Sequence, residues 1–196
     1  MSNDKPALRR ELKHRIGTLD ENYINESNVG ILNVLLALPE FISAPRVFTY
    51  LSVEREVDTR AMIAMCAELG KPVAIPGDMN GGLMSFGLLD RPFAELYKGP
   101  FGIPVPAHNA LRLQPEPGDI MIVPALCCTG SGYRLGHGGG YYDRYLSAHE
   151  VFSVCLCREK LILETLPLEP HDVPVNCVIT EKGLRGPVGP RICSLW

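Results

Sequence analysis

A glycine-rich stretch from Gly132 to Arg144 contains the residues of this sequence with the clearest capacity for chemistry. It reads G-Y-R-L-G-H-G-G-G-Y-Y-D-R and joins an apolar run to a helix-forming segment. Glycines let backbone N–H groups approach an anion, and the start of a helix adds positive potential. The spacing matches neither G-x-x-x-x-G-K-[ST] nor G-x-G-x-x-G, so the glycines alone are equally compatible with a long flexible turn. Arg134, a fixed cation with a forked donor, favours a phosphate-binding loop.

Two aspartates near this stretch have the chemistry to hold a divalent cation. Asp143 directly follows the paired tyrosines Tyr141 and Tyr142, and Asp172 lies shortly before the last apolar run. Carboxylate oxygens are hard ligands of the kind that Mg²⁺ prefers. Taken alone, Asp172 is more typical of a turn, and the tyrosine pair is more typical of core packing.

The first predicted helix carries two stripes. Each stripe recurs every four residues, which places its members on one helix face. They are the basic Lys5, Arg9 and Lys13 and the apolar Leu8, Leu12 and Ile16. The apolar stripe predicts the buried face. On helix physics alone, a basic stripe is more often a solvated face than a binding surface.

Helices and apolar strands alternate along the chain. We expect helices from about residue 5, over 20–38 and 59–69, from residue 141, and a short one over 160–166. We expect strands over 46–51, 72–76, 83–88, 119–124, 151–156 and 176–180. Residues 89–117 are expected to be rich in loops, and the glycine stretch and the chain from Gly183 onward are expected to be loops. Unbroken apolar strands between helices predict an α/β, Rossmann-like, three-layer domain with a mainly parallel sheet flanked by helices.

The bulk properties narrow the class of protein. The 196 residues suit a single domain, which we assign to 1–183, with an irregular tail over 184–196. A net charge of −3 gives no indication of a nucleic-acid partner. No signal-like or membrane-spanning run occurs, so we expect a cytoplasmic protein with no membrane partner. We also expect a monomer, although the sequence does not disclose the oligomeric state. The seven cysteines form no C-x-x-C, and we interpret them as small buried hydrophobic residues rather than disulfides or zinc ligands.

Several motifs together resemble the 5-formyltetrahydrofolate cyclo-ligase family. Residues 134–144 are similar to its glycine-loop signature, and residues 5–9 are similar to its N-terminal K-x-x-L-R. Residues 50–59 resemble Y-x-S-x-x-x-E-x-[DE]-T, and 166–172 resemble L-P-x-x-x-x-D. Residues 119–124 resemble the strand before the loop. The motifs occur in the family's order and cover about residues 5–183.

The resemblance implies a role for each matching position. ATP would be bound by Lys5, Arg9, Arg134, Leu135, Gly136, His137, Gly138, Gly139, Gly140, Tyr141 and Tyr142. A reduced formyl-folate would be bound by Leu51, Glu56, His137, Tyr141 and Tyr142. Arg134 and Tyr142 would be catalytic, and Asp143 and Asp172 would hold Mg²⁺. A carboxylate at Glu56 suits the donor edge of a pterin ring.

The implied reaction closes 5-formyltetrahydrofolate to 5,10-methenyltetrahydrofolate through a phosphorylated formyl group, with release of ADP and phosphate. Such a transfer requires positioning and charge neutralisation rather than a protein nucleophile. A catalytic thiol at Cys127 or Cys128 is the alternative, and packing at a strand end is the simpler interpretation.

Three departures from the family pattern leave other functions open. Cys128-Thr129 stands where the family usually has Phe-Asp, Val105 stands where a glutamate is common, and His137 occupies a variable position. They motivate a second hypothesis, an ATP-dependent enzyme of the same superfamily acting on another formamide or carboxylate. A third is a non-catalytic folate- or nucleotide-binding module, which would bind ligand without releasing phosphate.

Overall fold

The computed structural model describes residues 4–99 and 102–186 of the chain. Its helices are α1 (Lys5–Gly17), α2 (Glu21–Leu36), α3 (Pro39–Ser43), α4 (Arg60–Glu68) and α5 (Tyr141–Ala148), with 3₁₀ turns at Phe93–Glu95 and Glu159–Leu161. Its strands are β1 (Val47–Phe48), β2 (Val73–Asn80), β3 (Leu83–Leu88), β4 (Tyr97–Lys98), β5 (Pro104–Val105), β6 (Arg112–Leu113), β7 (Ile120–Val123), β8 (Cys127–Thr129), β9 (Arg134–Leu135), β10 (Phe152–Leu156), β11 (Ile162–Leu163), β12 (Cys177–Thr180) and β13 (Gly183–Arg185).

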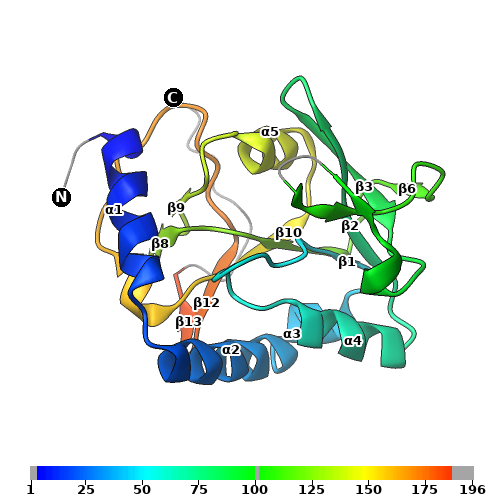
Figure 1. Cartoon of the computed structure of the whole chain (residues 1–196), viewed down its shortest axis with the longest axis horizontal. Helices are drawn as coiled ribbons and strands as arrows, with labels where there is room; N and C mark the ends of the chain where they lie inside the picture. The colour runs from blue at the N-terminus through cyan, green and yellow to red at the C-terminus, as the bar shows by residue number, and fades with distance from the viewer. Residues whose placement is uncertain (1–3, 100–101, 187–196) are drawn as a thin grey trace.

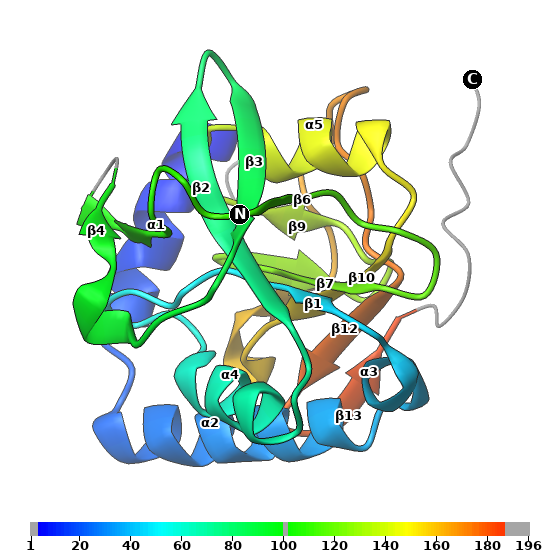
Figure 2. The ribbon, with the colours of Figure 1, turned by 90° about the vertical axis from the view of Figure 1, so that its right-hand side faces the viewer.

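The described strands build one large sheet with the order β13-β12-β10-β7-β1-β2-β3-β6. The central strands β12, β10, β7, β1 and β2 pair in parallel, and β13, β3 and β6 add antiparallel pairs at the edges. Figure 1 shows the sheet between α5 on one side and α2, α3 and α4 on the other. The turned view in Figure 2 shows the same layers. The predicted three-layer α/β fold with a mainly parallel sheet is confirmed.

Alternating apolar residues give the sheet a core on each face. In β7, Ile120 and Ile122 pack into the core under α2, α3 and α4. Their neighbours Met121 and Val123 pack into the opposite core, which also contains residues of α1 and α5. All four side chains are fully buried. A parallel strand covered on both faces requires such an unbroken apolar run, which is why β7 was readily predicted.

Local capping explains where the first two helices begin. The Asp4 carboxylate accepts a hydrogen bond from the Ala7 N–H, and the Asp20 carboxylate caps α2 through two backbone N–H groups. Gly30 is tolerated inside α2 because a Cβ there would lie 2.8 Å from the Cβ of Glu181. Close packing of α2 against the β12–β13 turn therefore requires glycine.

Three expectations about local structure are wrong. Residues 160–166 do not form a helix, because a 3₁₀ turn ending at Leu161 leads into β11, which pairs with β8. The glycine stretch is not all loop, because β9 pairs with β8 in a hairpin. The chain is not irregular from Gly183, since β13 pairs with β12 through residue 185. The rest of the predicted tail, from residue 187, lies outside the described residues.

The six cysteines within the described part of the chain are buried and unbridged. This confirms their interpretation as packing residues, while Cys193 lies outside the described residues. No helix in the described segments has both the length and the apolar composition needed to cross a bilayer.

Candidate functional site

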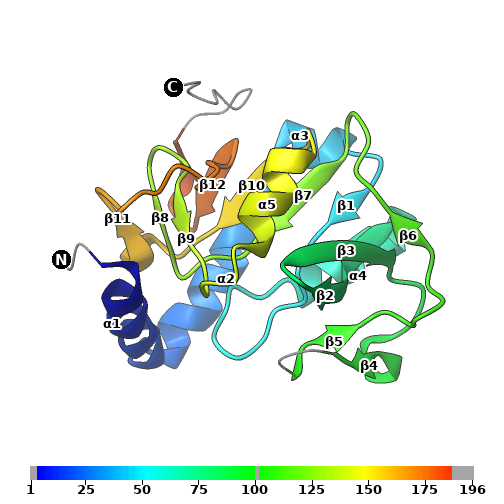
Figure 3. The ribbon, with the colours of Figure 1, turned by 90° about the horizontal axis from the view of Figure 1, so that it is seen from above.

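A pocket of about 1070 Å³ opens beyond the carboxyl ends of the central strands. Its walls include residues that follow β1, β7 and β10, together with part of α1. Figure 3 shows α1 and the β8, β9 and β11 strands gathered on this side of the large sheet. The order of the strands reverses between β1 and β7, and in open α/β sheets ligands bind at such a reversal. Every residue predicted to belong to the site lies on the wall of this one pocket.

The glycine loop, residues 136–140, joins β9 to α5 and forms one wall. Gly138 and Gly140 have φ values of 107° and 64°, in the left-handed region that favours glycine. The loop carbonyl at Gly136 accepts a hydrogen bond of 3.0 Å from Nε of Arg9. Among the described groups, no acceptor takes a hydrogen bond from the backbone N–H of residues 136–140. These donors and the start of α5 make the loop a suitable cradle for an anion.

Arg134 is nearly buried at the base of this loop and organises its surroundings. One guanidinium nitrogen donates to Asp143 Oδ1 at 3.1 Å, and the other donates to the Val173 carbonyl at 2.6 Å. Asp143 Oδ1 also accepts from the Val173 N–H at 3.2 Å. The start of α5 and the segment before β12 are therefore joined through one arginine and one aspartate.

Lys5 approaches the pocket from the first turn of α1. Its ammonium donates to both oxygens of Asp172, at 2.7 and 2.8 Å, and to Glu169 at 2.6 Å. Desolvation acts to lower the pKa of Lys5, but the hydrogen bonds and charges of the two carboxylates outweigh it and raise that pKa. Lys5 is thus a fixed cation at the rim of the pocket, already bound to the aspartate that the sequence assigns to a metal.

The predicted metal pair is placed on one wall, but its two carboxylates have different partners. Asp143 lies against Arg134, whereas Asp172 is bound by Lys5. Within the described segments, the group whose ligand atoms lie within 4.8 Å of one another is Glu169, His171 and Asp172, without Asp143. Joint binding of one ion by the two aspartates therefore stays a prediction.

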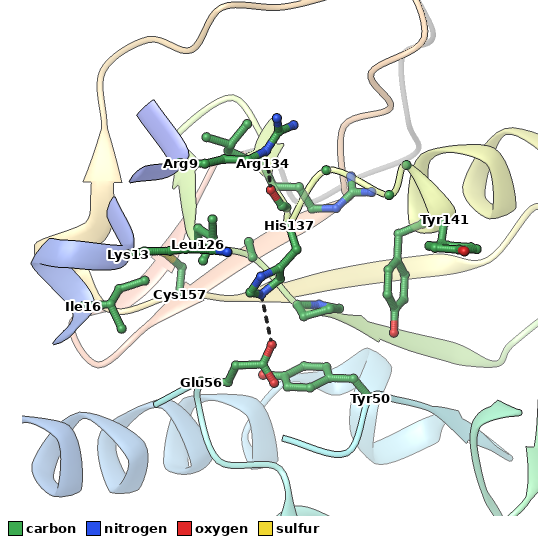
Figure 4. Close-up of a pocket in the computed structure, with 18 of the residues that line it drawn as sticks. Arg9, Lys13, Ile16, Tyr50, Glu56, Leu126, Arg134, His137, Tyr141 and Cys157 are labelled. Carbon is green, nitrogen blue, oxygen red and sulfur yellow. Dashed lines mark hydrogen bonds and ion pairs between the residues drawn. The ribbon is translucent and has the colours of Figure 1, made fainter. Parts of the chain in front are cut away.

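The facing wall is the Glu56 loop, residues 51–58, which follows β1. Glu56 Oε2 accepts from the Val53 N–H at 3.0 Å, and Oε1 lies 3.4 Å from Nε2 of His137. Figure 4 shows His137 reaching from the glycine loop toward Glu56 across the pocket. Leu51, at the start of the loop, is buried. This wall offers an apolar surface and one anchored carboxylate.

Tyr142 contributes a hydroxyl group without a partner. Its oxygen is buried, and no described group hydrogen-bonds to it. Burial, together with the nearby Glu56 carboxylate, raises the pKa of Tyr142, so that the phenol stays protonated at neutral pH. The hydroxyl group is therefore a donor whose hydrogen bond is unused among the described groups.

The cysteines near the loop do not have the properties of nucleophiles. Desolvation raises the pKa of Cys127 to about 12 and raises that of Cys128 well above its usual value. Neither residue lines the pocket. Because the thiolate is the reactive form, packing is the better interpretation of both residues.

Three arginines that support the site were given no role by the sequence. Arg144 donates to the carbonyls of Gly82 and Gly139, and so ties the glycine loop to the β2–β3 turn. Arg55 and Arg158 hold the Glu56 loop. Arg158 had a detectable signal, since a charged residue lies two positions after the last residue of the apolar strand β10, at the end where the pocket lies.

Comparisons with known proteins agree on one family. The model of the 5-formyltetrahydrofolate cyclo-ligase family matches residues 1–181. The 5-formyltetrahydrofolate cyclo-ligase of Mycolicibacterium smegmatis is 33% identical over 162 residues, which cover 76% of this chain and 79% of the relative. A probable 5-formyltetrahydrofolate cyclo-ligase of Schizosaccharomyces pombe is 28% identical over 94% of this chain and 99% of its own length. The solved structure of Aquifex aeolicus 5,10-methenyltetrahydrofolate synthetase superposes with a TM-score of 0.81 at 31% identity, covering 98% of this chain and 96% of that one.

Proposed function

The chain belongs to the 5-formyltetrahydrofolate cyclo-ligase family, and we propose that it closes 5-formyltetrahydrofolate to 5,10-methenyltetrahydrofolate with consumption of ATP. One observation carries the proposal. A single pocket has an anion-binding wall on one side, an apolar wall with an anchored carboxylate on the other, and an unpartnered Tyr142 hydroxyl. Its volume of about 1070 Å³ exceeds the ~300–1,000 Å³ of pockets for one small ligand, which suits two substrates.

The anion-binding wall receives the ATP phosphates. The free N–H groups of the glycine loop donate to phosphate oxygens, and Arg9, already bonded to the loop, adds charge. Lys5 exchanges one of its carboxylate partners for a phosphate oxygen. Arg134, buried and fixed by two contacts, keeps its guanidinium close to the transferred group.

The facing wall receives the folate. The pterin edge presents paired N–H donors, and the anchored carboxylate of Glu56 is a matching acceptor. Leu51 and Tyr141 supply apolar contact. The contact between Glu56 Oε1 and His137 Nε2 crosses the space between the walls, so it opens when the pterin binds.

The chemistry follows in two steps. The formyl oxygen on N5 attacks the γ-phosphorus of ATP, the bond to ADP breaks, and an imidate phosphate forms. The N10 nitrogen then attacks the formyl carbon, the carbon–oxygen bond breaks, phosphate leaves, and N10 loses its proton. Arg134 offsets the charge on the transferred phosphoryl group, and the Tyr142 hydroxyl donates to the substrate oxygen.

The residues on the wall also suit Mg²⁺. Asp143 and Asp172 offer hard oxygen donors, and the Lys5 ammonium between Asp172 and Glu169 indicates that this end of the pocket attracts a cation. Asp143 and Asp172 would hold the ion. When bound, it would neutralise charge on the phosphates of ATP.

The second candidate, an ATP-dependent enzyme with another formamide or carboxylate substrate, has weaker support. Of the positions that depart from the family pattern, Val105, Cys128 and Thr129 are buried and do not line the pocket. His137 alone among the four lines the pocket. The departures therefore leave most of the substrate surface unchanged.

The deciding experiment follows the absorbance of methenyl-folate formed from 5-formyltetrahydrofolate, with and without MgATP. We expect product only with MgATP, together with one phosphate per product. Turnover of another formamide under conditions that leave 5-formyltetrahydrofolate unchanged would favour the second candidate. Binding of both ligands without phosphate release would indicate a non-catalytic module.

A further inference from the structure

Arg158 is a buried cation whose contacts all go to neutral acceptors. Its residue is 2% exposed, yet none of the described carboxylates forms an ion pair with it. Its Nε donates to Ser27 Oγ at 3.1 Å, and one terminal nitrogen donates to Asn28 Oδ1 at 2.9 Å. A buried charge held without a counter-ion is costly, so its retention requires a compensating role.

The remaining contacts of Arg158 identify that role. Its guanidinium donates to the carbonyls of Arg55 at 2.9 Å and Glu56 at 3.1 Å. Two consecutive carbonyls of the Glu56 loop therefore point at one rigid fork of donors, which is anchored to α2 on its other side. Arg158 lies on the pocket wall two residues after the end of β10, so it links the sheet, α2 and the loop.

The loop that Arg158 holds is strained. Glu54 has a φ of 48°, the one non-glycine residue with a left-handed backbone among those described. Residues with side chains avoid this region, and such a conformation persists only where the surroundings over-determine it. Glu54 is exposed and offers no packing that would explain its conformation. The contacts that fix it come from its neighbours.

We infer that Arg158 is a positioning residue for the folate substrate, which holds the strained turn at Glu54 so that the Glu56 carboxylate faces the pterin. The inference rests on the proposed function, because it specifies how the folate wall of that site is set. Arg158 acts through Glu56 and is not required to touch the substrate. Its replacement should therefore weaken folate recognition while leaving nucleotide binding intact.

The test compares Arg158→Lys with Arg46→Lys. Arg46 is partly buried, though less so than Arg158, and is bound to Asp119, but it precedes β1 at the opposite end of the sheet. Because lysine cannot reproduce the fork, Arg158→Lys should raise the folate KM roughly ten- to a hundredfold with the KM for ATP unchanged. Arg46→Lys should leave both KM values unchanged. An equal rise in both KM values of Arg158→Lys, or no rise, would overturn the inference.

Two further variants separate positioning from general stability. In a Glu56→Gln background, Arg158→Lys should add little to the folate KM, because both changes act through the same carboxylate. Glu54→Gly should partly restore the folate KM of Arg158→Lys, since glycine adopts this φ without strain. If Arg158→Lys and Glu56→Gln have fully additive effects on the folate KM, and Glu54→Gly does not lower the KM of Arg158→Lys, the arginine is purely structural.

Hydrogen exchange gives a readout that needs no turnover. The Val53 amide bonds to Glu56 Oε2, and the Glu56 amide bonds to the Val53 carbonyl. Both amides should exchange at least about tenfold faster in Arg158→Lys, with α5 amides unaffected. If Arg158→Lys does not fold, Ser27→Ala, which removes one acceptor, should produce the same change more weakly. Unchanged hydrogen exchange in the folded Arg158→Lys variant would contradict the inference, whatever the substrate proves to be. Absence of turnover of 5-formyltetrahydrofolate by the wild type would contradict only the proposed function.

Discussion

The two walls of the pocket differ in how their polar groups are satisfied. On the wall formed by the glycine loop and α1, the backbone N–H groups of residues 136–140 have no acceptor among the described residues. On the wall formed by the Glu56 loop, the polar groups are internally bonded, with Arg158 on two carbonyls, Tyr50 on the Val57 carbonyl and Val53 on Glu56. Under the proposed function, the unused N–H groups of the first wall would donate to the phosphate oxygens of ATP. The second presents a single fixed carboxylate, which under the proposed function would accept from the pterin ring.

The largest effect is expected where the walls meet the transferred phosphoryl group. Asp143→Asn and Asp172→Asn should each lower kcat about a hundredfold or more, because both change charge around the phosphates. If they hold one ion, the double variant should be little worse than either single variant, and raised Mg²⁺ should partly rescue each single variant. Asp90→Asn, at an exposed aspartate away from the pocket, is the control. Normal kcat in both single variants, or full activity in chelator, would remove the aspartates from the reaction.

The folate wall is tested by Glu56→Gln. Loss of a charge-assisted contact should raise the folate KM roughly ten- to a hundredfold and leave the KM for ATP unchanged. The control is Glu68→Gln, at an exposed glutamate of α4 that does not line the pocket. Steady-state kinetics with each substrate varied in turn measures both constants. If Glu56→Gln changes the KM for ATP instead of the folate KM, Glu56 contributes to nucleotide binding rather than to folate binding.

The nucleotide wall is tested at α1. Lys5→Ala and Arg9→Ala should each raise the KM for ATP about tenfold, since each removes one cation near the phosphates. Arg10→Ala, at an exposed neighbour on the same helix, should have no effect. Deletion of residues 1–10 should combine the two losses and spare folate binding. If the deletion leaves the affinity for ATP unchanged, the basic stripe of α1 is only a solvated face and does not bind the nucleotide.

The smallest expected effect concerns pH. Because burial raises the pKa of Tyr142, the phenol stays protonated in the folded protein well beyond its ordinary pKa of about 10. Stability from this shift is present below about pH 10 and is lost above it, as the unfolded chain ionises. Tyr142→Phe should lower kcat by about tenfold without altering the shape of the pH–rate profile below pH ~10. If the rate of the wild type falls above pH ~9 and this fall disappears in Tyr142→Phe, the phenol of Tyr142 is not a neutral donor.

The sequence predicted the fold where periodicity is strong and missed it where pairing is tertiary. The apolar run of β7 and the apolar stripe of α1 depend on local spacing, and both were correctly predicted. The short strands β9, β11 and β13 exist because a partner strand lies beside them, and no local pattern distinguishes them from loop. Residue 163 therefore lies in a strand where the sequence indicated a helix.

A similar division holds for the site. The glycine loop and the family motifs identified residues that do line one pocket. The supporting arginines were missed because their acceptors are backbone carbonyls far along the chain, such as Gly82 for Arg144 and Arg55 for Arg158. The binding of Lys5 to Asp172 was also missed, because it joins residues separated by 167 positions. Spacing along the sequence contains no information about such contacts.

The most direct test of two walls with separate ligands is a calorimetric titration of MgATP and of 5-formyltetrahydrofolate, each alone, into three proteins. These are the wild type, Glu56→Gln, and the double variant Lys5→Ala/Arg9→Ala. We predict that Glu56→Gln keeps wild-type affinity for MgATP and loses folate affinity, and that the double variant shows the reverse. Loss of both ligands in both variants, or of neither, would contradict the division of the pocket into a phosphate wall and a folate wall.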